Sequence, residues 1–133
     1  MRTSLLTSAA TIAVAAVLAA GCGGSSGGGS SSAASAVAGA QVVEIDVASS
    51  GFAFTTSTAT AKAGPVELKS KNPQSVSHDI SLKGNGVSVQ GNMVSNGGVS
   101  TVTVADLKPG TYTFYCSVPG HEQAGMKGTL TVS

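Results

Sequence analysis

Thirteen residues near the carboxyl end of the chain decide how the rest of the sequence is interpreted: Cys116-Ser-Val-Pro-Gly-His-Glu-Gln-Ala-Gly-Met-Lys-Gly128. They place a thiol, an imidazole and a thioether at the regular spacing Cys116-x4-His121-x4-Met126. The proline and the glycines between them are turn residues, and strand-like alternation flanks the stretch on both sides. We therefore expect one short loop between two strands that carries three side chains with metal-binding chemistry.

From Gln41 onward, the chain is rich in threonine and valine and alternates between apolar and polar residues. Turn residues interrupt this alternation at short intervals, and no segment longer than a turn has helical periodicity. Residues 87–98 are rich in glycine and asparagine and predict no regular element. About eight short strands predict an all-β protein, a β-sandwich or barrel. The expected strands are residues 43–47, 52–54, 58–62, 66–71, 76–83, 99–105, 112–116 and 128–133.

Two of the side chains with metal-binding chemistry fall on inward faces of expected strands. Alternation places His78 on the same face as Ile80, with Asp79 and Ser81 on the opposite face. Cys116 shares its face with the two aromatic residues of the preceding strand. The thiol and one imidazole are therefore expected to point into the interior.

Thiolate, imidazole and thioether groups are soft or borderline ligands, which suit copper better than any hard cation. The loop holds one imidazole, and a second must come from His78, the only other histidine in the chain. Taken singly, each residue has an ordinary explanation: an inward histidine is usually a hydrogen-bonded core residue, a loop methionine usually packs, and a buried cysteine usually behaves as a small hydrophobe. Together they predict a mononuclear copper site, with a thiolate and two imidazoles in a plane and a weak axial thioether. Zinc would accept the cysteine and histidines but seldom takes methionine as its fourth ligand.

The segments 115–121 and 125–128 resemble the C-terminal signature of the cupredoxins, the plastocyanin/azurin family of blue copper proteins. The resemblance extends to residues 72–82, where that family places its first histidine ligand after an asparagine-bearing strand. The spacing Cys-x4-His-x4-Met is close to that of auracyanin-like and rusticyanin-like members, whereas plastocyanins typically have two residues between the cysteine and the histidine.

By this resemblance the fold is a Greek-key β-sandwich that binds one copper ion. The ligands that carry over are His78, Cys116, His121 and axial Met126. The family also often joins its two ligand segments through the residue after the first histidine, commonly asparagine, which hydrogen-bonds near the serine or threonine that follows the cysteine. Asp79 and Ser117 occupy these positions, so the resemblance implies the same clamp with aspartate in place of asparagine.

The resemblance implies a type 1 (blue) copper protein that carries single electrons between membrane-associated redox partners, such as a cytochrome, an oxidase, a reductase or a photosynthetic complex. We expect no enzymatic activity, because an oxidase or nitrite reductase needs a further copper centre with more histidines, and both histidines are already assigned. The alternative is a copper-binding or chaperone module at the cell surface. Such chaperones more often use several methionines or exposed histidines, whereas the expected mature domain has only Met93 and Met126.

The first twenty-two residues predict export and lipid attachment. An apolar run from Leu5 to Ala20 is too short to span a bilayer and is typical of a secretory signal. Leu18-Ala-Ala-Gly-Cys22 resembles a bacterial lipobox, which predicts a lipoprotein signal peptide over residues 1–21 and acylation of Cys22. The alternative is ordinary signal cleavage after Ala20 or Gly21, which leaves a free thiol. We expect a protein held by lipid at the outer face of the cytoplasmic membrane, or on the periplasmic side.

The segment that follows is a predicted tether. Residues 22–40 consist almost entirely of glycine, serine and alanine, from which no core can be built. The predicted domain organisation is therefore a signal peptide of residues 1–21, a lipidated tether of residues 22–40 and a cupredoxin domain of residues 41–133.

Charge and cysteine content exclude several other classes. Removal of Arg2 with the signal peptide leaves six lysines against six acidic residues, so no basic surface predicts nucleic-acid binding. The chain has two cysteines, and acylation of Cys22 would leave Cys116 as a single thiol without a disulfide partner. We expect a monomer that meets its redox partners transiently.

Overall fold

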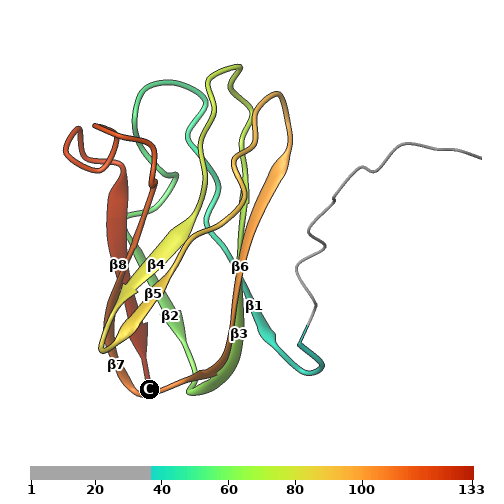
Figure 1. Cartoon of the computed structure of the whole chain (residues 1–133), viewed down its shortest axis with the longest axis vertical. Coiled ribbons are helices and arrows are strands. Elements are labelled where there is room, and N and C mark those ends of the chain that lie inside the picture. Colours follow the sequence, from blue (N-terminus) through green and yellow to red (C-terminus); the bar gives the residue numbers. More distant parts are fainter. Residues whose placement is uncertain (1–36) are drawn as a thin grey trace, which may run out of the picture. The chain divides into compact units, whose positions relative to one another are not determined.

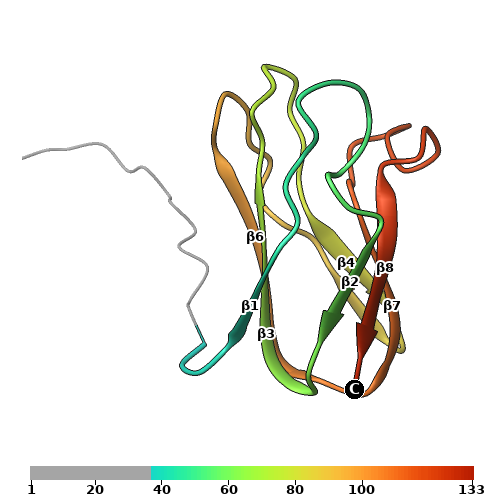
Figure 2. The same ribbon diagram turned by 180° about the vertical axis from the view of Figure 1, so that it is seen from behind.

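The computed structural model describes residues 37–133, which form one compact unit of two β-sheets. One sheet has three strands in the order β1-β3-β6, and the other has five in the order β2-β8-β7-β4-β5 (Figures 1 and 2). The strands are β1 (Gln41–Glu44), β2 (Thr58–Ala61), β3 (Gly64–Lys71), β4 (Ser81–Gly84), β5 (Val87–Val89), β6 (Val99–Leu107), β7 (Gly110–Tyr115) and β8 (Lys127–Val132). The all-β sandwich predicted from the alternation is confirmed.

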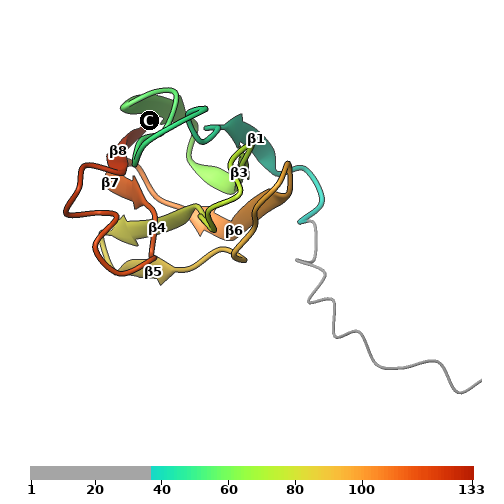
Figure 3. The same ribbon diagram turned by 90° about the horizontal axis from the view of Figure 1, so that it is seen from above.

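Both sheets mix parallel and antiparallel pairs. β1 pairs in parallel with β3, and β2 pairs in parallel with β8, whereas the other neighbours are antiparallel. Figure 3, a view from above, shows the two sheets facing each other around a common interior. The described residues contain no helix long and apolar enough to cross a membrane.

The core between the sheets is built from the inward residues of the alternating strands. Its larger members are mostly aliphatic, and only three are aromatic. The buried apolar residues are Ile45, Val47, Phe54, Ala61, Val66, Leu68, Ile80, Leu82, Val102, Leu107, Tyr112, Phe114, Cys116, Met126, Leu130 and Val132. Cys116 and Met126 thus belong to the core as well as to the loop that they delimit.

Long connections gather at the end of the sandwich away from the C-terminus, as Figures 1 and 2 show. They are residues 45–57, 72–80, 90–98 and 116–126. The last of these is the loop singled out in the sequence, and it begins as β7 ends and finishes where β8 begins. The end of the sandwich that carries these four loops is called the loop end below.

The structure differs from the predicted strands most clearly at four places. The strand expected over residues 43–47 begins earlier, at Gln41, and ends at Glu44. Residues 52–54 form no strand, and only an isolated bridge joins Val47 to Phe54. The strand predicted over residues 76–83 begins at Ser81, because His78 pairs with Val94 in a separate bridge. The short strand β5 lies inside the glycine-rich segment from which no regular element was expected.

The edge strand β6 is covered at its start by side chains and not by another strand. The Asn92 side chain accepts a hydrogen bond from the Thr101 N–H (2.9 Å) and donates one to the Val99 carbonyl (3.2 Å). Between these positions, the buried Ser100 hydroxyl accepts the Ile80 N–H at 3.0 Å. The first three residues of this edge are therefore already hydrogen-bonded within the chain.

Candidate metal centre

Three side chains with metal-binding atoms converge at the loop end of the interior. Cys116 Sγ lies 3.7 Å from His78 Nδ1 and 3.5 Å from His121 Nδ1, and the two Nδ1 atoms are 3.2 Å apart. Within the described part of the chain, these residues form a group whose ligand atoms all lie within 4.8 Å of one another. Two imidazole nitrogens and one cysteine sulfur this close together suit a metal ion of borderline or soft character.

His78 is held by backbone pairing rather than by a regular strand. Its N–H donates to the Val94 carbonyl (3.0 Å) and its carbonyl accepts the Val94 N–H (2.9 Å). The buried Asn72 amide donates to the carbonyls of Val94 (2.6 Å) and Val76 (2.8 Å), which ties the two flanking segments together. The His78 side chain is fully buried, so its imidazole has one fixed environment.

The other three predicted ligands lie on the loop from Cys116 to Met126, which closes on itself through backbone hydrogen bonds. The Cys116 N–H donates to the Met126 carbonyl (3.1 Å), and the Met126 N–H donates to the His121 carbonyl (3.0 Å). Gly120 and Gly125 have φ values of 86° and 106°, which favour glycine at these two turns. Closure brings the thiol, the half-buried imidazole and the fully buried methionine to the same end of the molecule.

Asp79 joins the two ligand segments, as the resemblance implied. Its carboxylate accepts the Ser117 N–H (2.6 Å), the Ser117 hydroxyl (2.8 Å) and the Ser81 hydroxyl (2.6 Å). The alternation placed Asp79 and Ser81 on an outward face, and this prediction is wrong, because both are fully buried. The carboxylate therefore fixes the residue after His78 to the residue after Cys116, and it does so in the buried interior.

Burial shifts the pKa values of both interior donors, His78 and Cys116. It lowers the pKa of His78, an effect that the neighbouring His121 strengthens and the Asp79 carboxylate opposes. Burial also raises the pKa of the Cys116 thiol above its ordinary value. At neutral pH the metal-free centre therefore holds a protonated thiol and a neutral imidazole, and metal uptake must release the thiol proton.

A salt bridge fixes the outer side of the loop to the five-stranded sheet. Lys83 Nζ lies 2.6 Å from Glu122 Oε1 and 4.4 Å from the centroid of the Tyr115 ring. The pair joins β4 to the middle of the loop, beside His121. Both side chains are partly exposed, which makes this a weaker connection than the buried Asp79 clamp.

Phe52 is part of the site, although no pattern in the sequence indicates this role. Its ring centroid lies 4.5 Å from that of His121 and 6.4 Å from that of His78. The alternation had assigned Phe52 to a strand, whereas it lies on the loop between β1 and β2. Nothing in the local sequence indicates which distant segment such a loop will reach.

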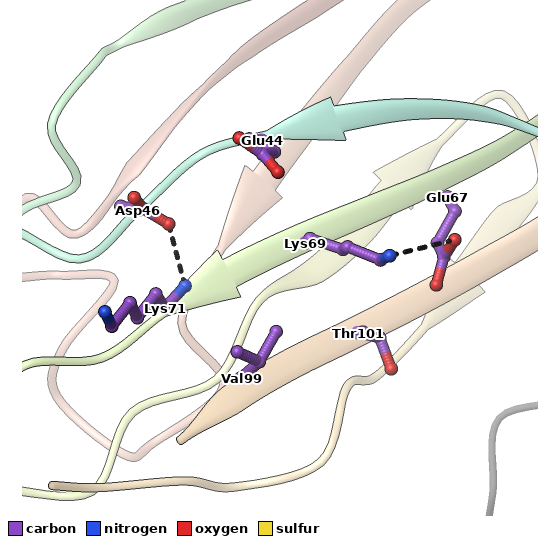
Figure 4. Close-up of a pocket in the computed structure, with 7 residues that line it drawn as sticks. All are labelled: Glu44, Asp46, Glu67, Lys69, Lys71, Val99 and Thr101. Carbon is purple, nitrogen blue, oxygen red and sulfur yellow. Dashed lines mark hydrogen bonds and ion pairs between the residues drawn. The ribbon is translucent and has the colours of Figure 1, made fainter. Parts of the chain in front are cut away.

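A hollow on the outer face of the β1-β3-β6 sheet offers no comparable chemistry (Figure 4). Its volume is about 570 Å³, and its lining mixes acidic and basic side chains with Val99 and Thr101. Lys69 pairs with Glu67 at 3.7 Å, and Asp46 accepts the Lys71 backbone N–H at 2.8 Å. Because the charges of this face are of both signs, no single ligand class is favoured there.

The plastocyanin/azurin family of copper binding proteins matches residues 41–133 of the chain. The chain belongs to this family. Copper is therefore the cofactor of this cupredoxin, and the three converging donors with Met126 nearby in the same loop suit it well. Of the expected donors, His78, Cys116 and His121 occur together in one place and Met126 is buried at the end of the same loop, whereas Cys22 lies outside the described residues.

Auracyanins are among the proteins to which this cupredoxin is similar. Auracyanin-B of Chloroflexus aurantiacus is 51% identical over 41 residues, a match that covers 31% of this chain and only 17% of the relative. The solved structure of auracyanin B is 30% identical, with a TM-score of 0.62. The match covers 71% of this chain and 89% of the auracyanin chain. A reduced auracyanin from the photosynthetic bacterium Roseiflexus castenholzii is 26% identical, with a TM-score of 0.63. The match covers 71% of this chain and 99% of that auracyanin.

Proposed function

We propose that this cupredoxin is a one-electron carrier whose type 1 copper centre would be held by His78, Cys116, His121 and Met126. The observation that carries the proposal is the convergence of two Nδ1 atoms and one Sγ atom, each supplied by a segment fixed by backbone hydrogen bonds. Copper, when bound, supplies a one-electron couple between Cu(I) and Cu(II).

The roles of the chain's own residues follow from their environments. Cys116 gives up its proton and donates as a thiolate, and the two neutral imidazoles donate through Nδ1. Met126, buried in the core, offers a weak thioether that favours the reduced state. The backbone pairing of His78 and the Asp79 clamp keep these donors in nearly the same positions in both states, so that little reorganisation accompanies electron transfer.

Optical and EPR spectra of the copper-loaded protein test the type 1 centre. We expect an intense blue absorption that arises from charge transfer from the Cys116 thiolate to Cu(II). Cys116→Ser should abolish the colour, because a hydroxyl cannot supply the donor orbital. A Cys116→Ser protein that remains blue would remove this thiol from the centre.

The half-buried edge of His121 is the proposed route for electrons. Its loop neighbours Pro119, Ala124 and Gly125 are exposed and are small or apolar, which suits brief docking over a small area. Ala124→Lys should therefore slow electron self-exchange while the blue spectrum stays unchanged. Val118, another apolar neighbour in the loop, is a poorer place for this change, because it packs against the core.

The alternative, a copper-binding or chaperone module, predicts the opposite pair of rates. A carrier should exchange electrons rapidly with a second copy of itself and release copper slowly. A chaperone should exchange electrons slowly and pass copper quickly to an acceptor. Measurement of self-exchange by NMR line broadening and of copper loss to a chelator on the same sample separates the two, and fast copper loss with slow exchange would reject the carrier.

We also propose that the protein is exported and anchored through acylated Cys22, and that it serves membrane-associated redox proteins. The support is the lipobox-like Leu18–Cys22 segment and the glycine- and serine-rich stretch before the folded unit. Cys22→Ala should release the protein from the membrane fraction or block its processing. Recovery of the native protein as an unacylated species in the soluble fraction would contradict the anchor.

A further inference from the structure

Phe52 and Phe54 lie two residues apart and have different surroundings. Phe54 is 8% exposed and packs edge to face against Phe114, with ring centroids 5.5 Å apart. Phe52 is 48% exposed, and its ring lies against the two imidazoles instead. Since Phe54 already fills the core at this point, packing of the interior does not explain why a large aromatic residue stands at position 52.

The Phe52 ring makes its closest aromatic contact with His121. The centroid separation of 4.5 Å and the interplanar angle of 40° describe a tilted stack at the short end of the favourable range for aromatic pairs. The two imidazoles lie 4.9 Å apart, so the three rings form one cluster. Of the two imidazoles, that of His121 is only half-buried and its backbone bonds lie within its own loop, so it gains most from a neighbour that restricts its orientation.

The loop that carries Phe52 is itself closed. The Ala48 N–H donates to the Ala53 carbonyl at 3.0 Å, and Gly51 turns the chain with a φ of 75°. The bridge between Val47 and Phe54 closes the base of this turn. Phe52 therefore lies at the tip of a small hydrogen-bonded loop.

Gln74 fixes this loop to the segment that carries His78. Its side-chain amide donates to the carbonyls of Ala48 (2.9 Å) and Gly51 (3.0 Å), and its backbone N–H donates to Asn72 Oδ1 (3.0 Å). The Asn72 amide in turn donates to the carbonyl of Val94, the residue that pairs with His78. A continuous series of hydrogen bonds thus connects the Phe52 loop to the buried side of the centre.

We propose that Phe52 is a positioning residue that holds the His121 imidazole in its ligating orientation, and that Gln74 keeps the Phe52 loop in place. Phe52 is then also the outermost contact on the ring through which electrons pass, a consequence that rests on the proposed carrier function. The positioning itself does not rest on it, because the ring contact belongs to the chain alone.

The test compares Phe52→Leu with Phe52→Tyr, which keeps the aromatic face, and with Met93→Leu as a matched control at another exposed apolar residue of the loop end. Proton NMR of the metal-free protein reports the ring contact directly. In Phe52→Leu, the His121 ring-proton signals should lose the ring-current shift that they have in the wild type. Phe52→Tyr should keep that shift, and Met93→Leu should leave it unchanged.

The same variants are loaded with copper for a second measurement. Loss of one aromatic contact should speed copper release to a chelator by about two- to tenfold in Phe52→Leu, with the wild-type rate restored in Phe52→Tyr. Gln74→Ala should act in the same direction with a smaller effect. In the double variant it should add little to the effect of Phe52→Leu, because both changes disturb the same contact between Phe52 and His121.

Unchanged His121 signals together with unchanged copper release in Phe52→Leu would overturn the positioning role. This outcome is distinct from failure of the proposed function. A wild-type protein that is blue and exchanges electrons, with a Phe52→Leu variant that matches it in every measurement, rejects the inference alone. A wild-type protein without blue copper rejects the carrier, while the NMR experiment on the metal-free chain still decides the role of Phe52.

Discussion

The two histidines direct the same nitrogen at the same point, yet the chain holds them in different ways. His78 is fully buried, and its backbone pairs with Val94 in a bridge that Asn72 strengthens. His121 is half-buried, and its backbone bonds lie within the loop itself, to Val118 and Met126. One side of the centre is therefore fixed by contacts between distant segments, and the other is fixed locally and faces outward. The contrast separates a ligand held in the closed interior from a ligand that is partly accessible from outside.

Glycine substitution of each histidine should expose this contrast most strongly. Both His121→Gly and His78→Gly should lose the blue spectrum. Added free imidazole should restore colour to His121→Gly, because that ring is accessible from outside, but not to His78→Gly, whose imidazole lies in the closed interior. Optical titration with imidazole measures the difference. Equal recovery in both variants would show that the two sides are equally accessible.

Asp79→Ala should weaken the connection between the two sides. The change leaves the Ser117 N–H and two serine hydroxyls without the buried carboxylate that accepts their hydrogen bonds. We expect a loss of about 3 kcal/mol in the free energy of unfolding of the metal-free protein, measured in urea. Asp106→Asn, at an exposed carboxylate, is the control and should change it by less than about 0.5 kcal/mol. A similar small loss in Asp79→Ala would mean that the clamp contributes little.

Substitutions at Met126 test whether the loop also sets the reduction potential of the copper. Met126→Gln should lower the reduction potential, since a harder oxygen ligand favours Cu(II), and Met126→Leu should raise it. Met93→Gln, at a residue that is 59% exposed, should leave the potential unchanged. Protein-film voltammetry on the three variants gives the comparison. Potentials that do not respond to either change at position 126 would make Met126 a packing residue.

Glu122→Gln should have the smallest effect. It removes the ion pair with Lys83 on the outer side of the loop, where both side chains are partly exposed. We expect a loss of only about 0.3–1 kcal/mol in the free energy of unfolding and an unchanged blue spectrum. Added salt should reduce the difference between variant and wild type, because exposed pairs are screened. A loss as large as that expected for Asp79→Ala would place the main anchor of the loop on its outer side.

The sequence was sufficient to predict the structure where a single physical rule determined the position of a side chain. Strands such as β3 and β7 alternate because one face lies against the core, so their inward residues could be read directly. The spacing of Cys116, His121 and Met126 brought three side chains to one loop, and the chain contained only one other histidine to complete the set.

The remaining features depend on contacts between distant segments. Asp79 and Ser81 alternate with buried residues and yet are buried themselves, because the chain at this point is covered on both sides: Ser81 Oγ also accepts the Gly91 N–H. An alternation of apolar and polar residues with a period of two cannot reveal a segment that is buried on both of its faces. The position of Phe52 depends on where Gln74 fixes its loop, and no local pattern encodes that pairing.

The way in which Asn92 covers the start of β6 has a consequence for self-association. An uncovered edge strand offers a row of free N–H and C=O groups to any second copy of the chain, which is a common route to sheet extension and aggregation. Here a single amide imitates one residue of a neighbouring strand by bonding both Thr101 and Val99. The start of this edge is therefore closed to strand addition by a second copy of the chain, because the groups that such a strand would pair with are already hydrogen-bonded to Asn92.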